Sequence, residues 1–364
     1  MSSFWTPAPP AKTKLGVYRQ LSPTAGVHVS PIQLGAMSIG DKWEGLGAMD
    51  KENSFELLDA YYGAGGNFID TANNYQDESS EEFLGEWMEQ RGVRDQIVVA
   101  TKYTTNYKRT EALGQKTHYT GNNVKSMHIS VEASLKKLRT SYIDILYVHW
   151  WDWTCSIEEV MNGLHYFVSH GKVLYLGISD TPAWIVAKAN TYAKAHGKTP
   201  FVIYQGAWSI LQRDFERDIL PMAREEGMAL APWNVLAGGK IRSDAEEQRR
   251  KETGENGRTM SGSNWERNEN EVKISHALEK VANEVGTKNI SAVAIAYVMQ
   301  KQNIEALEIA LSPEQIQYLE SILPFDLGFP MNRFGVGTEY ISAFKSTGNY
   351  EKWPRAEPIK PTKK

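Results

Sequence analysis

Short apolar runs alternate with amphipathic stretches along most of this chain. Seven of the runs have the length and composition of buried strands, and each is followed by a helical pattern or a long loop. The predicted strands cover residues 32–37, 67–70, 97–102, 143–149, 173–178, 201–204 and 228–231. The predicted helices cover residues 51–64, 79–91, 124–139, 157–170, 183–196, 215–226, 267–285 and 291–301, with a last one after Ser312.

This repeating order predicts an α/β fold with a parallel sheet. A doubly wound sheet is one form of it, but no G-x-G-x-x-G motif follows an early strand. The even spacing of the strands favours a (β/α)8 TIM barrel, in which chemistry takes place at the carboxyl ends of the strands.

The chain is predicted to form one barrel, over residues 27–323, with residues 27–30 in a small hairpin. An N-terminal extension (1–26) precedes it, and a C-terminal tail (324–364) is expected to wrap its surface. Residues 242–271 are polar and rich in glycine, which indicates a surface excursion or lid.

Composition narrows the range of partners. Of the 364 residues, 41% are hydrophobic and 23% are charged, as in an ordinary globular protein. The net charge of -4 argues against a nucleic-acid partner. No apolar run approaches the roughly 18 residues that a membrane span needs, and the N-terminus lacks a signal-peptide pattern. The single cysteine, Cys155, excludes an internal disulfide and disfavours a thiolate metal site. We therefore expect a cytoplasmic protein without a bound metal.

Three predicted strands end in ionisable side chains: Asp70, Lys102 and His149. Tyr75 follows five residues after Asp70, in a polar loop. Each residue alone has a structural explanation, for example a solvated strand end or a hydrogen-bonded core histidine. In a barrel, however, all four would meet at one mouth.

Such a group suits carbonyl reduction. Hydride addition to a carbonyl carbon leaves negative charge on the oxygen, which must then be protonated. Tyr75 could supply that proton, if the Lys102 ammonium lowers its pKa from the usual value of about 10 and Asp70 pairs with the lysine. A neutral His149 could hold and orient the substrate oxygen.

Four blocks of this sequence resemble the aldo-keto reductases, most of all the fungal aryl-alcohol dehydrogenase and norsolorinic acid reductase branch. They are GNFIDTANNY at 66–75, ATKY at 100–103, YIDILYVH at 142–149 and GKVLYLGIS at 171–179. The resemblance extends over nearly the whole chain. It implies a barrel of the aldo-keto reductase type, NADP(H) bound without a Rossmann domain, and a role in secondary metabolism.

The resemblance also implies roles for individual residues. Asp70, Tyr75, Lys102 and His149 would form the catalytic tetrad, with Tyr75 as general acid and base. The implied cofactor-binding residues are Asp70, Ser179, Asp180, Gln205, Trp208, Asn234, Val235, Leu236, Ala237, Gly238, Gly239, Lys240, Arg242 and Asn303. The substrate pocket would be lined by Trp43, Tyr103, His149, Trp150 and Trp151, although core packing explains aromatic residues equally well. The implied substrates are small aromatic aldehydes, ketones or alcohols.

One departure from the family pattern lies after Lys301. Relatives have an eighth strand there and a loop containing Gly, Arg and Lys that recognises the adenosine 2′-phosphate. Here Lys301 leads directly into QNIEAL at 302–307, which resembles the helix beyond that loop. The sequence therefore predicts a barrel without its eighth strand, and a helix over 302–311 from the spacing of Ile304, Leu307 and Leu311.

This departure predicts open edges near 32–34 and 228–231 and weak NADPH binding. Each charged hydrogen bond lost from a phosphate is worth roughly 1.5–3 kcal/mol. The main expectation is an NADPH-dependent oxidoreductase for aromatic carbonyls and alcohols. The alternative is a non-catalytic or cofactor-impaired relative with a binding or regulatory role. A phosphate-binding barrel lyase or isomerase is disfavoured, because the phosphate site of such barrels needs the seventh and eighth strands.

Overall fold

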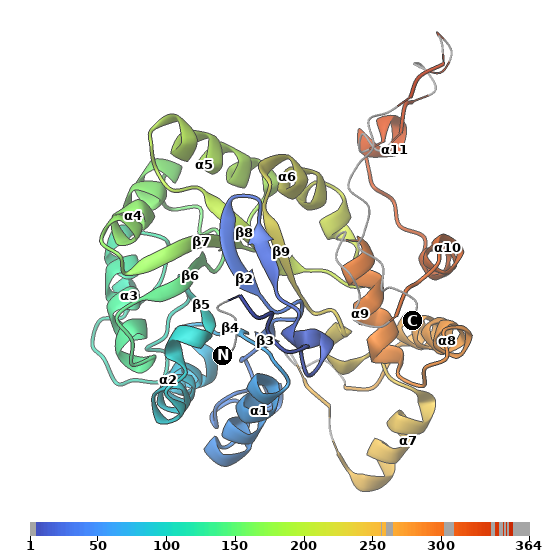
Figure 1. Cartoon of the computed structure of the whole chain (residues 1–364), viewed down its shortest axis with the longest axis horizontal. Helices are drawn as coiled ribbons and strands as arrows, with labels where there is room; N and C mark the ends of the chain where they lie inside the picture. The colour runs from blue at the N-terminus through green and yellow to red at the C-terminus, as the bar shows by residue number, and fades with distance from the viewer. Residues whose placement is uncertain are drawn as a thin grey trace.

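The computed structural model describes residues 5–255, 257–259, 265–301, 309–335, 339–341, 345, 347 and 349–351. Its centre is a curled parallel sheet of seven strands in the order β3-β4-β5-β6-β7-β8-β9 (Figure 1). These strands are β3 (Leu34–Gly35), β4 (Phe68–Asp70), β5 (Val98–Tyr103), β6 (Ile143–Val148), β7 (Val173–Ser179), β8 (Phe201–Ala207) and β9 (Ala229–Trp233). The predicted α/β barrel class is confirmed.

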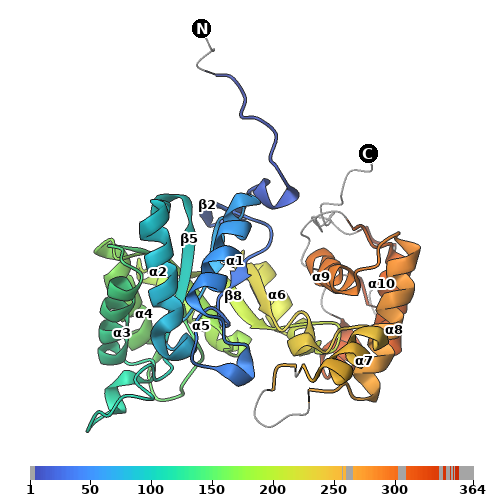
Figure 2. The ribbon, with the colours of Figure 1, turned by 90° about the horizontal axis from the view of Figure 1, so that it is seen from below.

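Helices follow the strands. The α-helices in the described part of the chain are α1 (Lys51–Gly63), α2 (Ser79–Arg91), α3 (Val124–Lys137), α4 (Ile157–Ser169), α5 (Ala183–Ala195), α6 (Ile219–Glu226), α7 (Asp244–Thr253), α8 (Glu269–Glu284), α9 (Ile290–Lys301), α10 (Pro313–Ile322) and α11 (Met331–Phe334). The helices α1 to α6 cover the outer face of the sheet (Figure 1). The helices α7 to α10 lie together beyond β9, on the side of the sheet opposite to α2, α3 and α4 (Figure 2).

The sheet has two unpaired edges within the part of the chain that the structure describes. One edge is β3 and the other is β9, and no eighth strand joins them among the described residues. This agrees with the predicted loss of the eighth strand. The predicted helix over 302–311 falls mostly on residues 302–308, which lie outside the described residues.

For residues 309–311 the predicted helix is wrong. The side chain of Gln300 donates to Ile309 O at 2.8 Å and accepts from the Leu311 backbone N–H at 3.1 Å. These two bonds satisfy backbone groups that a helix would otherwise pair internally. Leu311 is buried, and the next helix begins only after Ser312, as predicted. The structure adds a capping box between Ser312 and Gln315.

The sheet separates two apolar cores. Side chains of alternate residues along a strand point to opposite faces, so one set packs inside the barrel and the other against the helices. The inner set contains Phe68, Val98, Ala100, Ile145 and Tyr147. The outer set joins strand residues to the helices, as with Ile69, Val99 and Leu146.

An antiparallel hairpin, β1 (Arg19–Ser22) and β2 (Ala25–Val29), lies across the centre of the curled sheet (Figure 1). Ala25 and Val29 pack with the inner core, and β1 contacts β8. The hairpin therefore closes the amino-terminal end of the barrel. The hairpin begins at Arg19, so part of the segment predicted as an N-terminal extension covers this end of the barrel.

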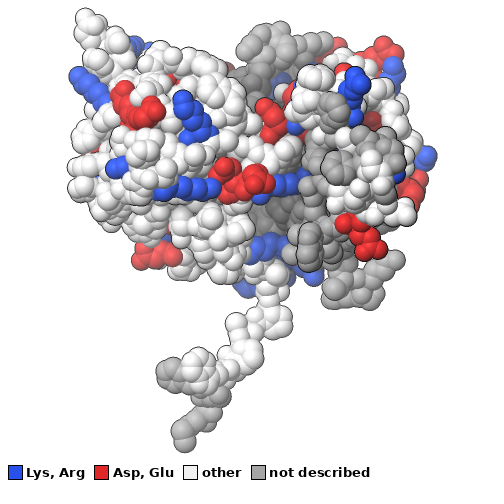
Figure 3. Space-filling model, turned by 90° about the horizontal axis from the view of Figure 1, so that it is seen from above, with Lys and Arg blue, Asp and Glu red and all other residues white. Residues whose placement is uncertain are grey.

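The surface carries both signs of charge. Basic and acidic side chains are interspersed on the face that Figure 3 presents, in keeping with the small net charge. No helix in the described part of the chain combines the length and apolar content needed to span a bilayer. In the predicted tail, Asp326 O accepts two bonds from Arg217, at 3.2 and 3.0 Å.

Candidate active site

Strand register brings the predicted acid–base residues together. Asp70 pairs with Ala100 across β4 and β5, and Lys102 pairs with Tyr147 across β5 and β6. Ala100 and Tyr147 belong to the inner core, so the two-residue period directs Asp70 and Lys102 inward as well. The same period directs Tyr103 outward, where it packs in the outer core.

Lys102 is the centre of the group. Its fully buried ammonium donates to Asp70 Oδ2 at 2.6 Å, to Thr71 O at 2.7 Å and to Tyr75 Oη at 3.4 Å. The other Asp70 oxygen accepts from Gln205 Nε2 at 3.1 Å. Every oxygen around the ammonium is thus fixed by the ends of strands or by the loop after β4.

The electrostatics of this group are dominated by burial. Burial alone would lower the pKa of Lys102, but Asp70 and Tyr75 outweigh it and the pKa of the lysine is raised. Burial raises the pKa of Tyr75, and the opposing effect of the Lys102 ammonium is smaller. The lysine therefore acts in the predicted direction, yet the phenol keeps its proton across the neutral range.

His149 follows β6 directly and lies against the phenol. Its ring centroid is 5.8 Å from that of Tyr75, and its Nδ1 is 3.3 Å from Thr105 Oγ1. Burial, assisted by the charge of Lys102, holds the pKa of His149 well below its usual value. The imidazole is therefore neutral at pH 7, as the sequence argument requires.

Asp70, Tyr75 and His149 face a cavity of about 1540 Å³ that runs from the mouth of the barrel along the seam between β3 and β9. Most of the predicted site residues line it: Trp43, Asp70, Tyr75, His149, Ser179, Asp180, Gln205, Asn234, Val235, Leu236, Ala237, Gly238, Gly239, Lys240 and Arg242. On the side where an eighth strand would run, the lining comes from α9, including Val298, Met299 and Lys301.

The part of the cavity beside the tetrad suits a polar amide. Ser179 Oγ is buried and has no hydrogen-bond partner among the described residues. The neighbouring Asp180 accepts from Trp233 Nε1 at 3.2 Å. Burial of the carboxyl group raises the pKa of Asp180 to about 6, although part of the residue is open to the cavity. These groups fit the carboxamide of a nicotinamide ring, which carries both donors and an acceptor.

The segment after β9 follows the cavity wall. Gly238 and Gly239 have φ values of 62° and 88°, a conformation that glycine adopts without strain, and their missing side chains leave room for a phosphate. Lys240 donates to Glu266 O. Arg242 donates to Glu247 Oε2 at 2.9 Å and to Trp265 O at 2.8 Å, so its guanidinium is engaged within the 242–271 excursion.

Five predicted residues do not line this cavity. One is Lys102, which is fully buried behind the wall and bonded to the lining residues Asp70 and Tyr75. Trp208 is fully buried, stacks on Phe215 at 5.2 Å and donates to Glu216, so it is a core residue rather than a wall for the nicotinamide. Tyr103 and Trp151 are buried in the outer core. Trp150 is 37% exposed, and its indole donates to Thr105 outside the lining.

A sixth predicted residue, Asn303, lies outside the described residues. Other lining residues were not predicted from the sequence, among them Asn74, Trp233, Arg250, Arg258 and Trp265. The last three come from the excursion, and its Thr259 donates to Gly45 O at 2.9 Å, across the mouth. The glycines and the charges of that segment were its only sequence signal. Asn74 could have been found from its place beside Tyr75.

A parallel α/β barrel that directs an Asp–Lys–Tyr group and a neutral histidine into a long cavity defines a class of barrel with acid–base chemistry at its mouth. The model of the aldo/keto reductase family matches residues 31–324 of this sequence. The chain belongs to the aldo/keto reductase family.

Curated relatives agree with this assignment. The chain is 62% identical over 384 residues to an NADP(+) aryl-alcohol dehydrogenase of Phanerodontia chrysosporium, covering 99% of this chain and 100% of the relative. It is 52% identical over 349 residues to aldo-keto reductase ausK of Emericella nidulans (91% and 87%) and 46% identical over 382 residues to norsolorinic acid reductase A of Aspergillus parasiticus (97% and 96%). The first alignment is longer than the 364 residues of this chain, so part of that relative has no counterpart here.

Proposed function

We propose that this protein is an NADPH-dependent oxidoreductase that interconverts aromatic aldehydes or ketones with the corresponding alcohols, and that it works in the cytoplasm. The observation that carries the proposal is the contact of the buried Lys102 with both Asp70 and Tyr75 at the cavity wall. The similarity to an aryl-alcohol dehydrogenase over the full length of that relative supports the choice of substrate class.

In this proposal NADP(H) supplies or accepts the hydride. Tyr75 holds the proton that the developing alkoxide requires, and its raised pKa keeps that proton in place until negative charge forms beside it. Lys102 stabilises the phenolate left behind, while Asp70 balances the buried positive charge. The neutral His149 can donate a hydrogen bond to the same substrate oxygen.

The cofactor would lie along the wall from Ser179 to Arg242. Ser179, Asp180 and Gln205 would contact the carboxamide, and residues 234–240 would follow the pyrophosphate. Lys240 and Arg242 would contribute positive charge near it, and both side chains are also bonded to protein groups. Trp43 would form one wall of the substrate pocket.

A second candidate is a relative whose cofactor binding is impaired. It is favoured by the two unpaired edges of the described sheet and by residues 302–308, whose sequence contains no Gly, Arg or Lys. The two candidates share the acid site and differ in how firmly NADPH is held.

The test is aldehyde-dependent oxidation of NADPH by the wild type and by Tyr75→Phe. Removal of a positioned acid reduces turnover by about 10²–10⁴-fold. Because the Tyr75 hydroxyl makes one long bond to Lys102, the variant should fold and bind NADPH as the wild type does. Equal turnover by the two proteins would refute the assigned role of Tyr75. A wild type that oxidises no NADPH at millimolar cofactor would refute the reductase activity.

A further inference from the structure

The turn that follows the proposed acid has an unusual backbone. Gln76, Asp77 and Glu78 have φ values of 52°, 48° and 84°, three left-handed residues in succession with no glycine among them. Such a conformation is unfavourable for residues with side chains, so surrounding contacts must hold it. Each of the three side chains is bonded to a different part of the molecule.

Gln76 holds the loop between β3 and α1. Its buried Oε1 accepts from the backbone N–H groups of Lys42 at 2.9 Å and Trp43 at 2.7 Å, and its Nε2 donates to Met37 O at 2.8 Å. Gly40 packs so closely on this side chain that a Cβ there would lie 2.4 Å from Gln76 Cβ. The backbone of Trp43 is thus fixed by the residue next to Tyr75.

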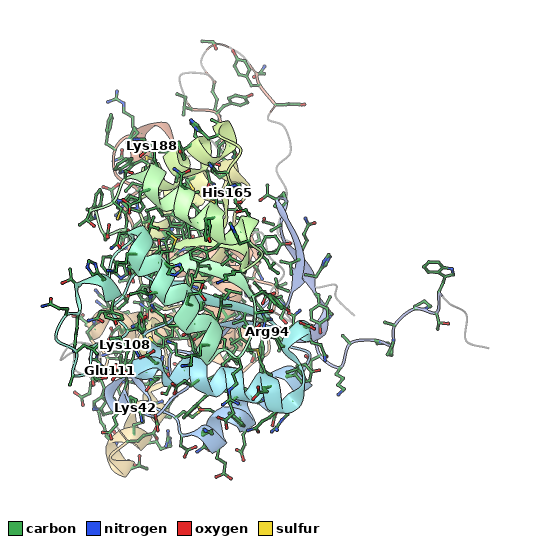
Figure 4. The ribbon with its side chains drawn as sticks, turned by 90° about the vertical axis from the view of Figure 1, so that its left-hand side faces the viewer. Lys42, Arg94, Lys108, Glu111, His165 and Lys188 are labelled. Atoms are coloured by element: carbon green, nitrogen blue, oxygen red, sulfur yellow. The ribbon has the colours of Figure 1, made fainter. Side chains whose placement is uncertain are left out.

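Asp77 and Glu78 hold the loop between β5 and α3. Asp77 accepts from Arg109 at 2.7, 3.0 and 3.2 Å through two guanidinium nitrogens. Glu78 accepts from Lys108 at 2.6 Å and pairs with Lys137 of α3 at 3.0 Å. Lys42 and Lys108 of the two loops lie at the same end of the molecule (Figure 4).

The two loops meet over one aromatic ring. The Arg109 guanidinium carbon lies 5.6 Å from the centre of the Trp43 ring, within the range of a cation–π contact. Trp43 lies edge to face with Tyr75 at 6.2 Å and lines the cavity. The contacts therefore form a closed circuit from Tyr75 through the turn to Arg109, Trp43 and back to Tyr75.

We propose that Asp77 and Arg109 are positioning residues that fix the Trp43 indole as the wall against which an aromatic substrate packs. This role rests on the reductase activity proposed above and adds to it a specific determinant of aromatic substrate binding. Arg109 touches the indole and the turn, and Asp77 orients its guanidinium. Neither residue takes part in proton transfer.

The exposure of the Arg109 side chain indicates that the residue contributes little to folding stability. The Arg109 side chain is 60% exposed, and exposed ion pairs contribute little to stability. Arg91 offers a matched control, because it also donates through Nε and a terminal nitrogen to one carboxylate, that of Asp59. The Arg91 side chain is 42% exposed and links α2 to α1, outside the residues that line the cavity.

The experiment compares wild type, Arg109→Met, Arg109→Lys and Arg91→Met with 2-naphthaldehyde at saturating NADPH, together with thermal unfolding of each protein. We expect Arg109→Met to raise KM about three- to tenfold, the range of a lost cation–π contact. Turnover should stay within about twofold of wild type, because the lost contact would stabilise the bound substrate and the transition state equally. Arg109→Lys should have a KM between those of wild type and Arg109→Met, and Arg91→Met should have the KM of wild type.

A second variant tests the circuit itself. Asp77→Asn should raise KM as Arg109→Met does, and the double variant should be no worse than either single one, because both remove the same contact. An unchanged KM in Arg109→Met, or an equal rise in Arg91→Met, would overturn the proposal while leaving the reductase activity intact. A wild type without turnover would instead refute the reductase activity, and this role with it.

Discussion

The two sides of this barrel differ in how their strands are supported. β5 and β6 have neighbours on both sides and every one of their residues is buried, whereas β9 is paired only with β8 and its residues are half-buried or exposed. We call the part of the barrel around β5 and β6 the closed side, and Lys102 in β5 lies there. The segment that would follow the pyrophosphate comes directly after the edge strand β9. The acid chemistry and the hold on the cofactor are thus carried by different parts of the barrel.

This difference teaches that a barrel can lack one strand while an acid–base site on its other strands keeps its hydrogen bonds. The four tetrad residues come from β4, from the loop after it, from β5 and from the residue after β6. Lys102 and His149 are separated from both edge strands by other strands, whereas Asp70 is on β4, next to the edge strand β3. The seam instead borders the cavity, where α9 forms the wall. We expect perturbations of the closed side to be costly and those of the seam to be mild.

The largest effect should follow Lys102→Met. The substitution leaves the Asp70 carboxylate buried without its partner, and breaking a buried ion pair in this way costs about 3–5 kcal/mol of unfolding free energy. Urea denaturation measures the loss, and aldehyde reduction should disappear as well. The double variant Asp70→Asn with Lys102→Met should regain much of the stability but none of the activity. Equal stabilities of single and double variants would contradict this account.

A matched pair of leucines compares the two sides directly. Leu146 in β6 is fully buried, so Leu146→Ala should cost about 2–5 kcal/mol. Leu230 in β9 is only partly buried and packs at the edge of the same core, so Leu230→Ala should cost about 1 kcal/mol. Chemical denaturation of both variants gives the two values. A Leu230→Ala loss as large as that of Leu146→Ala would mean that the seam is as firmly packed as the closed side.

The smallest effect concerns Asp180, whose carboxyl is shifted by burial from 3.8 to a pKa of about 6. Between these values the folded protein binds the proton more tightly than the unfolded chain, so this group makes the protein less stable as pH rises from about 4 to 6. Because the side chain is open to the cavity, the change should be about 1 kcal/mol or less.

Asp180→Asn isolates this contribution. His149, with its lowered pKa, gives the opposite slope below neutral pH, so the difference between wild type and variant is the quantity to measure. Thermal unfolding at several pH values should show that the wild type loses stability relative to the variant as the pH rises from 4 to 6. A difference that does not change with pH would contradict the raised pKa.

Local patterns in the sequence were enough to predict the strands, their order and the meeting of Asp70, Tyr75, Lys102 and His149. A two-residue period and a strand–helix repeat fix which strand ends share a mouth. Tyr103 shows that a position at a strand end does not by itself place a residue in the site. The two-residue period that directs Lys102 into the barrel directs Tyr103 to the opposite face, into the outer core.

Features that depend on loop conformation or on partners far along the chain could not be predicted from the sequence. Trp208 is held in the core by Phe215 and Glu216, which no spacing rule brings to it. The left-handed turn after Tyr75 contains no glycine, so the sequence does not indicate its conformation. Bonds to the loops at Trp43 and Arg109 hold it in place. The two residues we assign as positioning groups were therefore visible only in three dimensions.

The most direct test of the contrast between the two sides is NADPH binding, followed by protein fluorescence, for this protein and for the 62% identical Phanerodontia chrysosporium relative. Loss of a charged phosphate contact of about 1.5–3 kcal/mol predicts a Kd at least tenfold weaker here. At saturating NADPH the chain should nevertheless reduce an aromatic aldehyde in a reaction that requires Tyr75. Equal affinities of the two proteins would contradict the account.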